Sequence, residues 1–388
     1  MKHNLLTTTT IAMLLASGAY AQETIKIGVL TPLSGTYAGI GQQVRWGIDQ
    51  SVEEINAAGG IAGRQIELVY EDSEANPAVA VTKAEKLFTV DNVDFLTGTV
   101  NSGATLAVGQ VADRADKLIA TTVSFSDAIT GSGCSPNVFR VNARAGQQSV
   151  ALAAWLKQEK PGAKVYYLGP DYEMGRSTVA AFKERAESVG ATSTGQVFAP
   201  LDSKDYSQYF GQLRAARPDV LYTSVAGNDT VRLFTQMNDF GVSEGLTILG
   251  ASGTVTAQNI NAIGAAAEGF ITGVGYSVLI DSPENKAFTE AFRERNGADP
   301  DLYGADSYGL LFAYKAAVEA AGATDTDSVR ASLEGLSWDT PQGTKTIRAG
   351  DHQAMQPMYV VEVKNGQFTI ARSIAGEDAI GPDTCDKF

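Results

Sequence analysis

The sequence predicts an α/β fold with two lobes of similar build, each a mainly parallel β-sheet with helices on both faces. Three observations support this prediction. Short apolar runs alternate with longer helical patterns, and the same alternation starts again after residue 146. The chain of 388 residues is also too long for one ordinary hydrophobic core. A hydrophobic content of 44% and a charged content of 19% are typical of a globular protein.

The first lobe begins with a regular alternation of strands and helices. Strand-like apolar runs occupy residues 24–30, 66–72, 93–96 and 117–123. Helical patterns lie between them, over residues 42–58, over residues 77–90 and from residue 102 onward. Pro77 suits the first turn of its helix, where its missing N–H costs no hydrogen bond. Because strands joined through helices pair in parallel, this part of the chain predicts a parallel sheet.

The second lobe repeats the pattern. Strand-like runs are found at residues 163–169, 191–199 and 246–252, and helices are predicted at residues 147–159 and 173–190. The stretch 205–241 reads as helix, strand, loop and helix, and the glycine-broken stretch 269–278 is expected to cross between the lobes. Further helices are predicted at 283–297, 306–322 and 327–336. The end of the chain, 345–372, is strand-like, with a hairpin turn at "KNGQ".

Charge and the N-terminal segment limit the possible partners and the location. A net charge of −14 and a pI near 4.7 argue against nucleic acids and anionic membrane surfaces as partners. Residues 1–21 have a basic start, a short apolar stretch and small residues at Ala19 and Ala21, as in a cleaved secretory signal. The apolar stretch is too short to span a membrane, and no cysteine near the cut suggests a lipid anchor. We therefore expect an exported, soluble mature protein.

Two cysteines, Cys134 and Cys385, remain in the mature chain. In an oxidising compartment an even pair favours a disulfide, which here would tie the C-terminal tail to a distant loop. Two free thiols are the alternative. Neither cysteine has a neighbouring histidine or a C-x-x-C partner, so metal binding and redox catalysis are not expected.

Catalytic and cofactor-binding motifs are mostly missing. The first loop carries "GIGQQV" and lacks the third glycine of a dinucleotide site, although Asp72 ends the next strand and leaves a nucleotide-binding variant open. The only histidine of the mature chain, His352, cannot build a multi-histidine zinc site and is expected to be structural. We therefore expect no enzyme activity, no cofactor and no metal.

The loops that follow the strands offer hydroxyl groups and backbone donors instead. Such groups cluster at residues 34–37, 101–102, 124–126, 171–174 and 226–227. In an open α/β sheet, ligands bind at the carboxyl ends of the strands. Asn101 and Ser102 stand at a predicted helix start, where free N–H groups and the helix dipole favour an anion. For any single serine a helix cap is the simpler explanation. The recurrence of such loops in both lobes favours a binding site.

The chain resembles the type I periplasmic solute-binding proteins of ABC importers, in the leucine/isoleucine/valine-binding branch. The resemblance covers essentially the whole mature chain. It is carried most specifically by residues 25–77, "IKIGVLTPLSGTYAGIGQQVRWGIDQSVEEINAAGGIAGRQIELVYEDSEANP", and continues in "TGTVNSGATLAV", "SDAITGSGCSPNVFR", "DYEMGRS", "RPDVLYTSVAGNDT" and "EGFITGVGYS". It implies two Rossmann-like lobes joined by three crossover segments, with the ligand in the cleft between the lobes.

The resemblance also implies a division of the chain. Lobe 1 would comprise residues 24–142 and 277–349, and lobe 2 would comprise residues 143–276 and 350–388. The three crossings would fall near residues 141–144, 272–276 and 349–358.

The family's binding positions correspond to named residues here. Ser102 and the strand end at residues 123–126 match the positions that hold a ligand carboxylate. The side-chain pocket would be lined by residues matching Tyr172, Met174, Ala226 and Tyr303. The full set of expected ligand-binding residues is Tyr37, Asn101, Ser102, Ser124, Phe125, Ser126, Tyr172, Met174, Ala226, Ser252 and Tyr303.

One position departs from the amino-acid binders of this family. They carry an acidic residue that pairs with the ligand ammonium, and Ser252 stands at the matching place in "LGASGT". An unpaired buried ammonium is costly. Either another acid substitutes, such as Asp171 or Asp281, or the ligand lacks an α-ammonium; Glu244 is the nearest acid in sequence. The stretch "ITGSGCSPNVFR" also resembles binders of aromatic carboxylates, so both ligand classes stay open.

The resemblance implies a periplasmic subunit, expected to be a monomer, that closes on a small carboxylate-bearing solute and delivers it to the membrane permease of an ABC transporter. A branched-chain or other amino acid is one ligand, and an aromatic carboxylate or an amide is the other. A ligand-sensing receptor with the same lobes is the first rival function, and an enzyme is the second.

Overall fold

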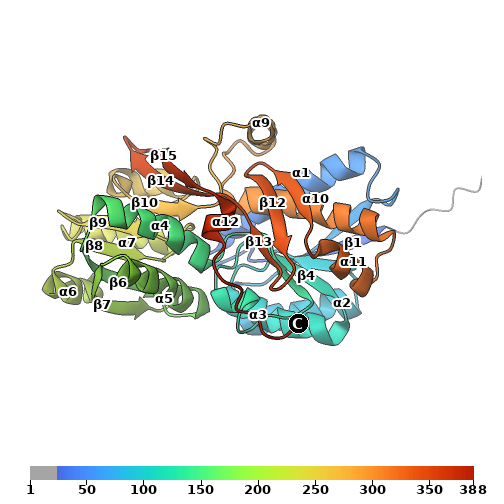
Figure 1. The fold of residues 1–388 in the computed structure, drawn as a ribbon, viewed down its shortest axis with the longest axis horizontal. Helices are drawn as coiled ribbons and strands as arrows, with labels where there is room; N and C mark the ends of the chain where they lie inside the picture. The colour runs from blue at the N-terminus through green and yellow to red at the C-terminus, as the bar shows by residue number, and fades with distance from the viewer. Residues whose placement is uncertain (1–23) are drawn as a thin grey trace, which may run out of the picture.

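The computed structural model describes residues 24–388, so the expected signal segment 1–21 lies outside the described residues. The described chain forms two α/β lobes that lie side by side (Figure 1). One contains an 8-stranded sheet and the other a 7-stranded sheet. The expected mixed α/β fold with two lobes is therefore confirmed.

The first sheet has the strand order β11-β12-β13-β5-β4-β3-β1-β2. Its parallel part consists of β1 (Ile25–Thr31), β2 (Ile66–Asp72), β3 (Phe95–Thr97), β4 (Leu118–Thr121) and β5 (Val138–Arg140). Three strands from late in the chain extend it: β11 (Ser337–Thr340), β12 (Gly343–Arg348) and β13 (Gln353–Met355). The strands β5 and β11 were not predicted.

The second sheet has the strand order β15-β14-β10-β9-β8-β6-β7. Its parallel strands are β6 (Lys164–Pro170), β7 (Thr192–Ala199), β8 (Val220–Thr223), β9 (Thr247–Gly250) and β10 (Ile271–Val274). The hairpin β14 (Met358–Lys364) and β15 (Gln367–Ile374) pairs antiparallel to β10, and its turn is the predicted "KNGQ".

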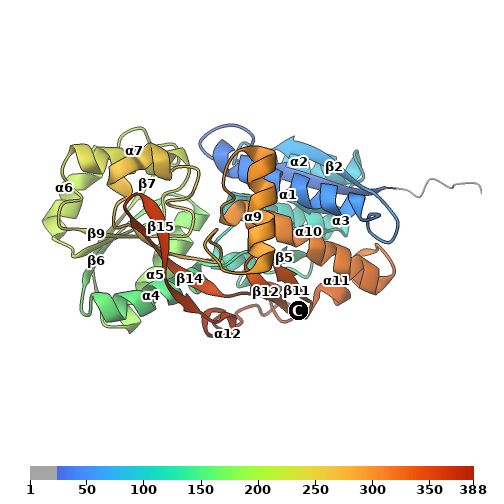
Figure 2. The ribbon, with the colours of Figure 1, turned by 90° about the horizontal axis from the view of Figure 1, so that it is seen from above.

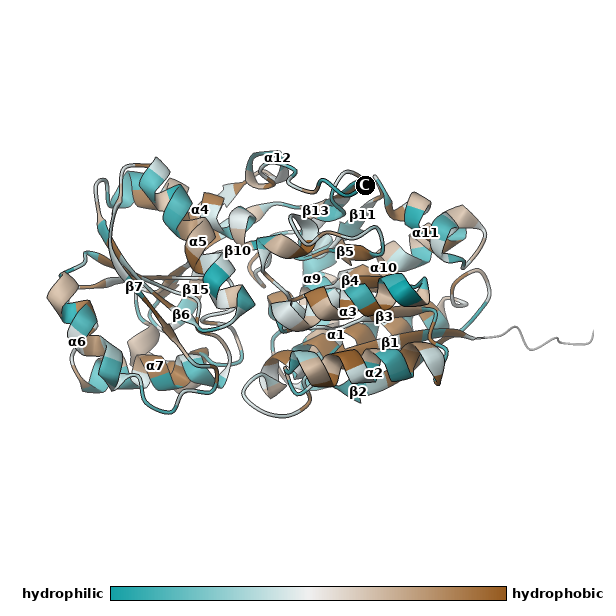
Figure 3. Cartoon of the chain, turned by 90° about the horizontal axis from the view of Figure 1, so that it is seen from below, coloured by the Kyte–Doolittle hydropathy of each residue, from teal (hydrophilic) through white to brown (hydrophobic). Residues whose placement is uncertain are grey.

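Helices cover both faces of each sheet. The first sheet carries α1 (Ala38–Ala57), α2 (Pro77–Thr89), α3 (Ser102–Ala115), α9 (Pro283–Asn296), α10 (Leu302–Ala321) and α11 (Thr326–Leu333). The second carries α4 (Ala145–Glu159), α5 (Glu173–Ser188), α6 (Ser207–Ala216), α7 (Asn228–Asp239) and the short α8 (Ile260–Ile263). Figure 3 shows the pattern behind this layering, because strands such as β1 are largely hydrophobic while α2 and α3 alternate hydrophobic and hydrophilic residues.

Buried apolar residues form separate clusters on the two faces of each sheet. In the first lobe, α1 and α10 pack together over one face, and α2 and α3 cover the other. In the second lobe, α4 and α5 share a core on one face, while α6 and α7 pack on the other. Each sheet therefore has its own core, as the length of the chain predicted.

The chain crosses between the sheets three times. It passes from β5 to α4, from β10 to α9, and from β13 to β14. Figure 2 shows α12 (Gly376–Ala379) at the junction between the lobes. The last change of sheet lies between Met355 and Met358, because β13 pairs with β5 of the first sheet. The expected lobe boundary at residue 349 thus falls before the observed change of sheet, and the division into lobes stays a prediction.

The C-terminal tail returns to the first lobe. Cys134 and Cys385 are joined by a disulfide, with 5.8 Å between their Cα atoms, as the even cysteine count favoured. The ring of Phe388 lies 4.4 Å from the ring of His352, which stacks in turn on Phe139. His352 is fully buried, and burial lowers the pKa of its imidazole. A packed, neutral ring fits the structural role expected for it.

Within residues 24–388, no helix is long and apolar enough to cross a membrane.

Candidate functional site

The loop between β3 and α3 forms a helix start with free donors. Gly98 has a φ of +94°, a left-handed conformation that turns the chain sharply after β3. Asn101 is the N-cap, and its side-chain oxygen accepts from the N–H of Ala104 at 3.1 Å. Within the described residues, the N–H groups of Ser102 and Gly103 have no hydrogen-bond acceptor. These donors and the positive end of the helix dipole make the start of α3 suitable for an anion.

The loop after β4 packs against this helix start. The N–H of Ser126 donates to Ser102 Oγ at 3.3 Å. Ser124 Oγ lies 2.6 Å from Thr105 Oγ1 and 3.1 Å from the carbonyl oxygen of Val100, so the Ser124 hydroxyl is held by the protein. Ser102, the first residue of α3, and Ser126, in the loop after β4, therefore meet at the helix start.

A buried arginine holds the loop after β4. Arg140, at the end of β5, is 0% exposed and donates through Nη1 to the carbonyl oxygens of Ser124 at 3.2 Å and Ser126 at 2.5 Å. Its Nε donates to Gln353 Oε1 at 2.6 Å. Burial lowers the pKa of Arg140 to about 9, so the guanidinium is still charged at neutral pH. The charged guanidinium of Arg140 thus fixes the loop after β4 through two hydrogen bonds.

The two lobes touch where the strands of both sheets end. The hydroxyl of Tyr37, before α1, lies 2.9 Å from the hydroxyl of Tyr172, before α5. Thr36 accepts through its carbonyl oxygen from the N–H of Asn228 at 3.2 Å, and its hydroxyl donates to Asp229 at 3.3 Å. Burial raises the pKa of both tyrosines, which keeps their hydroxyls protonated.

Aromatic and apolar side chains lie beside these contacts. Phe125 and Tyr303 stack with 6.2 Å between ring centroids and an interplanar angle of 28°. Met174 and Ala226, from the second lobe, are buried and belong to the same apolar cluster as Tyr37, Phe125 and Tyr303. The predicted aromatic and apolar residues from both lobes are therefore in or against one cluster, with polar donors on the first lobe.

Comparison with known proteins agrees with this architecture. The periplasmic binding protein family matches residues 24–367. The chain belongs to the periplasmic binding proteins, of type I. A Leu/Ile/Val-binding protein homolog 3 from Brucella melitensis is 28% identical over 335 residues, which is 85% of this chain and 88% of the relative.

Solved structures of type I periplasmic binding proteins share the fold. A solute-binding protein of an ABC transporter from Rhodopseudomonas palustris BisB5, in complex with 3,4-dihydroxybenzoic acid, has a TM-score of 0.84 and 25% identity, covering 91% of this chain and 98% of its own. A second one, from strain HaA2 in complex with p-hydroxybenzoic acid, has a TM-score of 0.84 and 27% identity, covering 93% and 98%. Proteins of this family bind solutes, and this chain has their architecture throughout.

The predicted substitutes for the missing acid are paired with a cation or exposed. Asp171 forms an ion pair with Arg176, in the first turn of α5. Asp281 forms an ion pair with Lys286, and its side chain is 87% exposed. Glu244 is exposed on the loop after α7. The hydroxyl of Ser252 donates to the carbonyl oxygen of Gly273 at 2.6 Å, so it is committed to the protein.

An acidic residue that was not predicted, Glu173, stands at the start of α5. Glu173, the first residue of α5, accepts a hydrogen bond from Ser126 Oγ at 2.6 Å, so it reaches from the second lobe to the first. In the stretch "DYEMGRS", only the neighbouring Tyr172 and Met174 were predicted to bind the ligand. Arg140 was missed as well, although a basic residue inside the apolar run "VFRV" signals a buried charge that needs partners.

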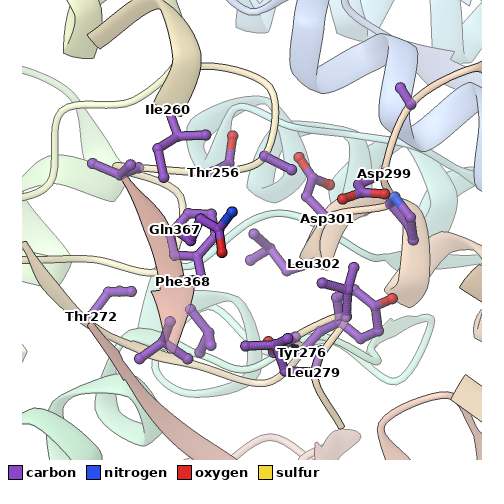
Figure 4. A pocket seen from close by; sticks show the side chains of 18 of the residues that line it. Thr256, Ile260, Thr272, Tyr276, Leu279, Asp299, Asp301, Leu302, Gln367 and Phe368 are labelled. Carbon is purple, nitrogen blue, oxygen red and sulfur yellow. Dashed lines mark hydrogen bonds between the residues drawn. The ribbon is translucent and has the colours of Figure 1, made fainter. Parts of the chain in front are cut away.

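A cavity of about 580 Å³ lies beside the cluster, between the two lobes (Figure 4). Its walls come from residues near β9, β10 and β15 on one side and from the segment before α10 on the other, with Tyr276, Asp301, Leu302 and Phe368 among them. Of the predicted ligand-binding residues, only Ser252 lines it. Asn101, Ser102, Ser124 and Ser126 lie instead at the start of α3, and the predicted aromatic and apolar residues belong to the buried cluster or pack against it.

Among residues 24–388, no group of histidine, cysteine, aspartate and glutamate side chains is arranged to hold a metal ion. The site offers hydroxyls, backbone N–H groups, one carboxylate and aromatic rings. Those groups can hold and orient a small polar molecule.

Proposed function

We propose that this periplasmic binding protein is the extracytoplasmic solute-binding subunit of an ABC importer, which captures a small carboxylate-bearing solute and delivers it unchanged to a membrane permease. The start of α3 carries the proposal. Two unpartnered N–H groups, the hydroxyl of Ser102 and the helix dipole converge there, next to groups from the other lobe. A carboxylate is the small anion that fits such donors.

Lobe closure would bury the solute. The contacts from Tyr37 to Tyr172 and from Thr36 to Asn228 join the lobes on the side of the strand ends. A hinge motion about the crossings would make and break them, and a solute that touches both lobes would favour the closed arrangement. The protein would act in the periplasm, as a monomer, after loss of the signal segment.

Two ligand classes have support. The relatives named as Leu/Ile/Val-binding proteins favour an amino acid. The structures with hydroxylated benzoic acids favour an aromatic carboxylate, and the stacked pair Phe125 and Tyr303 offers ring faces for it. Both classes share the carboxylate that the start of α3 would hold.

A binding screen tests the proposal. The purified mature protein is screened by thermal shift against amino acids, aromatic acids, short dicarboxylates and amides, and each hit is measured by calorimetry. Ser102→Ala should weaken binding by about 1–3 kcal/mol, because the carboxylate loses a donor in a buried site. Ser51→Ala is the control, since Ser51 is equally buried but lies within α1, bonded to Ile48. Unchanged binding in Ser102→Ala would contradict the carboxylate site.

A further inference from the structure

We propose that the C-terminal tail, residues 375–388, is a redox-sensitive strap that controls the solute site. Its disulfide joins the lobes and holds the loop that carries Ser124 and Ser126, so a dithiol that reduces the disulfide weakens solute binding. The effect on binding rests on the proposed function, because it assumes a solute at this loop. The hold of the tail on the lobes and on the loop does not depend on that assumption.

The tail connects the second lobe to the first. It follows β15 of the second sheet, and α12 within it packs against α4 at the junction between the lobes (Figure 2). Beyond α12, Cys385 is bonded to Cys134, which lies between β4 and β5 of the first sheet. The disulfide therefore adds a covalent connection between the lobes to the three crossings of the chain.

Two arginines hold the middle of the tail. Arg144, which precedes α4 of the second lobe, donates through Nη2 to the carbonyl oxygens of Ile380 at 2.8 Å and Pro382 at 2.7 Å. Arg348, in β12 of the first sheet, donates through Nη1 to the carbonyl oxygen of Gly381 at 2.8 Å. Arg144 is 4% exposed, so the tail supplies partners to a buried charge. Hydrogen bonds thus fix the tail to both lobes.

Backbone hydrogen bonds connect the disulfide to the loop of the solute site. The N–H of Cys134 donates to the carbonyl oxygen of Gly131 at 2.9 Å, and the N–H of Gly131 donates to that of Ala128 at 3.2 Å. The N–H of Ala128 donates in turn to Ser126 Oγ at 3.2 Å. Ser126 is the residue whose N–H reaches Ser102 at the start of α3. A series of hydrogen bonds therefore runs from the disulfide to the proposed anion site.

Arg144 connects the tail to the same loop. Its Nε lies 3.9 Å from Asp127 Oδ1, and this carboxylate oxygen also accepts from the N–H of Gly146 at 3.0 Å. Asp127 follows Ser126 directly, and its own N–H donates to Ser177 Oγ of the second lobe at 3.0 Å. If Arg144 loses its bonds to the tail, the positive charge that faces Asp127 is no longer fixed in place. The loop, the tail and both lobes therefore meet at this arginine.

Reduction would release the end of the tail. Cys134 is buried and Cys385 is half-buried, so a thiolate of the dithiol would attack the sulfur of Cys385. Cys134 then leaves as a thiolate, and the second thiol of the reductant frees Cys385 and becomes part of a new disulfide. The dithiol thus gives up two electrons and two protons. The flanking residues 382–384 and 386–388 are exposed, so they bury too little surface to stay in place without the covalent bond.

The test compares solute binding by the oxidised and the reduced protein. The probe is the tightest binder among leucine, 4-hydroxybenzoate and the other acids of the thermal-shift screen. Calorimetry should show about tenfold weaker binding after reduction with dithiothreitol, a usual size for coupling between two parts of a protein. Without any solute, hydrogen exchange of residues 127–134 should become faster on reduction, because this segment loses an anchor. Mass spectrometry confirms that the disulfide is reduced.

Two variants and a control locate the effect. Cys385→Ala has no disulfide, so it should bind like the reduced wild type, and dithiothreitol should not change its affinity. Gly381→Ala keeps the disulfide but disturbs the tail, because Gly381 has a φ of +68° and an added Cβ would lie 3.3 Å from Arg144 Nη2. It should weaken binding about threefold, as for partial loss of a hydrogen bond. The control is Gly322→Ala, since Gly322 has a φ of +63° at the end of α10 and an added Cβ meets no atom within 4 Å.

The outcomes separate this inference from the proposed function. Unchanged affinity after reduction overturns the control of binding, whatever the exchange of residues 127–134 shows. A loss of affinity in Cys385→Ala when dithiothreitol is added overturns it as well, because that loss cannot come from the disulfide. If no acid binds at all, the proposed function fails. The exchange measurement then decides alone whether the tail holds the loop, and unchanged exchange means that it does not.

Discussion

The hydroxyl of Tyr37 lies 2.9 Å from the hydroxyl of Tyr172, so this pair forms one of the side-chain hydrogen bonds that join the two lobes. The two residues are 135 positions apart in the chain, and each directly precedes a helix, α1 in one lobe and α5 in the other. The rings are tilted by 53° with 6.4 Å between centroids, so they are not stacked, and the hydroxyls form the hydrogen bond.

Replacing Tyr37 with phenylalanine should weaken solute binding by about 0.5–1.5 kcal/mol, the usual net contribution of one hydrogen bond. The aromatic ring of residue 37 stays, so its apolar packing is preserved. Only the hydrogen bond to Tyr172, which joins the lobes in the closed arrangement, is lost. Calorimetry of Tyr37→Phe and Tyr172→Phe, alone and together, measures the effect. The double variant should lose no more than either single one, because both remove the same bond, and additive losses would show that the hydroxyls act separately.

Gly227, just before α7, should be required for the lobes to meet. It has a φ of +63°, and an added Cβ would lie 2.6 Å from the carbonyl oxygen of Thr36 and 2.9 Å from the Tyr37 ring. Gly227→Ala should therefore hold the lobes apart and weaken solute binding at least tenfold, while each lobe stays folded. Small-angle scattering with saturating solute should show a larger radius of gyration than for the wild type.

The control for Gly227 is Gly211, in α6. An added methyl group there meets no atom within 4 Å, and its φ lies outside the left-handed region. Gly211→Ala should slightly stabilise the helix and leave solute binding unchanged. Equal binding in Gly227→Ala and Gly211→Ala would show that the approach of residue 227 to Thr36 is not needed.

Arg140→Met should destabilise the protein by about 2–6 kcal/mol, because the buried carbonyl oxygens of Ser124 and Ser126 lose their charged donor at a cost of about 1–3 kcal/mol each. The loop beside Ser102 should also lose its fixed position, so solute binding should fall together with stability. Urea unfolding and calorimetry measure the two effects. Arg295→Met removes an exposed ion pair with Glu53 and should change stability by less than about 1 kcal/mol.

Much of the fold follows from local sequence signals. Strand β2 spans Ile66–Asp72 as predicted, and α2 begins at Pro77, because alternating apolar runs and a first-turn proline act within a few residues. Helix α10 begins at Leu302, four residues earlier than predicted, since the side chain of Asp301 caps it by accepting from Tyr303 and Gly304. Strand β5, Val138–Arg140, was missed because a three-residue strand with a buried arginine has no apolar period.

The proposed binding site also has parts that local sequence signals predict and parts that they do not. Ser102 could be placed from the pattern of strand, loop and helix, because the helix start and its free N–H groups are local features. Glu173 could not, because its contact with Ser126 spans 47 positions and depends on how two separately folded lobes meet. The acids proposed from the sequence, Asp171 and Asp281, each pair with a cation close by in the sequence, and their role in binding stays a prediction.

Asp301 should make the protein less stable as the pH rises from 4 to 8. Its Oδ1 caps α10, but its Oδ2 is buried and has no hydrogen-bond partner within the described residues. Burial raises the pKa of Asp301 to about 7. A raised pKa in the folded state means that the native protein holds this proton more tightly than the unfolded chain does. The resulting stabilisation is complete below about pH 4 and disappears as the pH passes about 7.

Asp301→Asn should keep the cap and remove this dependence. The free energy of unfolding of the wild type, relative to that of Asp301→Asn, should fall between pH 4 and pH 8 by on the order of 4 kcal/mol, from 1.36 kcal/mol for each unit of pKa difference. Urea unfolding at both pH values measures it. Asp239→Asn, at an exposed position ending α7, is the control and should track the wild type at every pH. If the free energies of unfolding of the wild type and of Asp301→Asn differ by the same amount from pH 4 to pH 8, Asp301 does not titrate in this range.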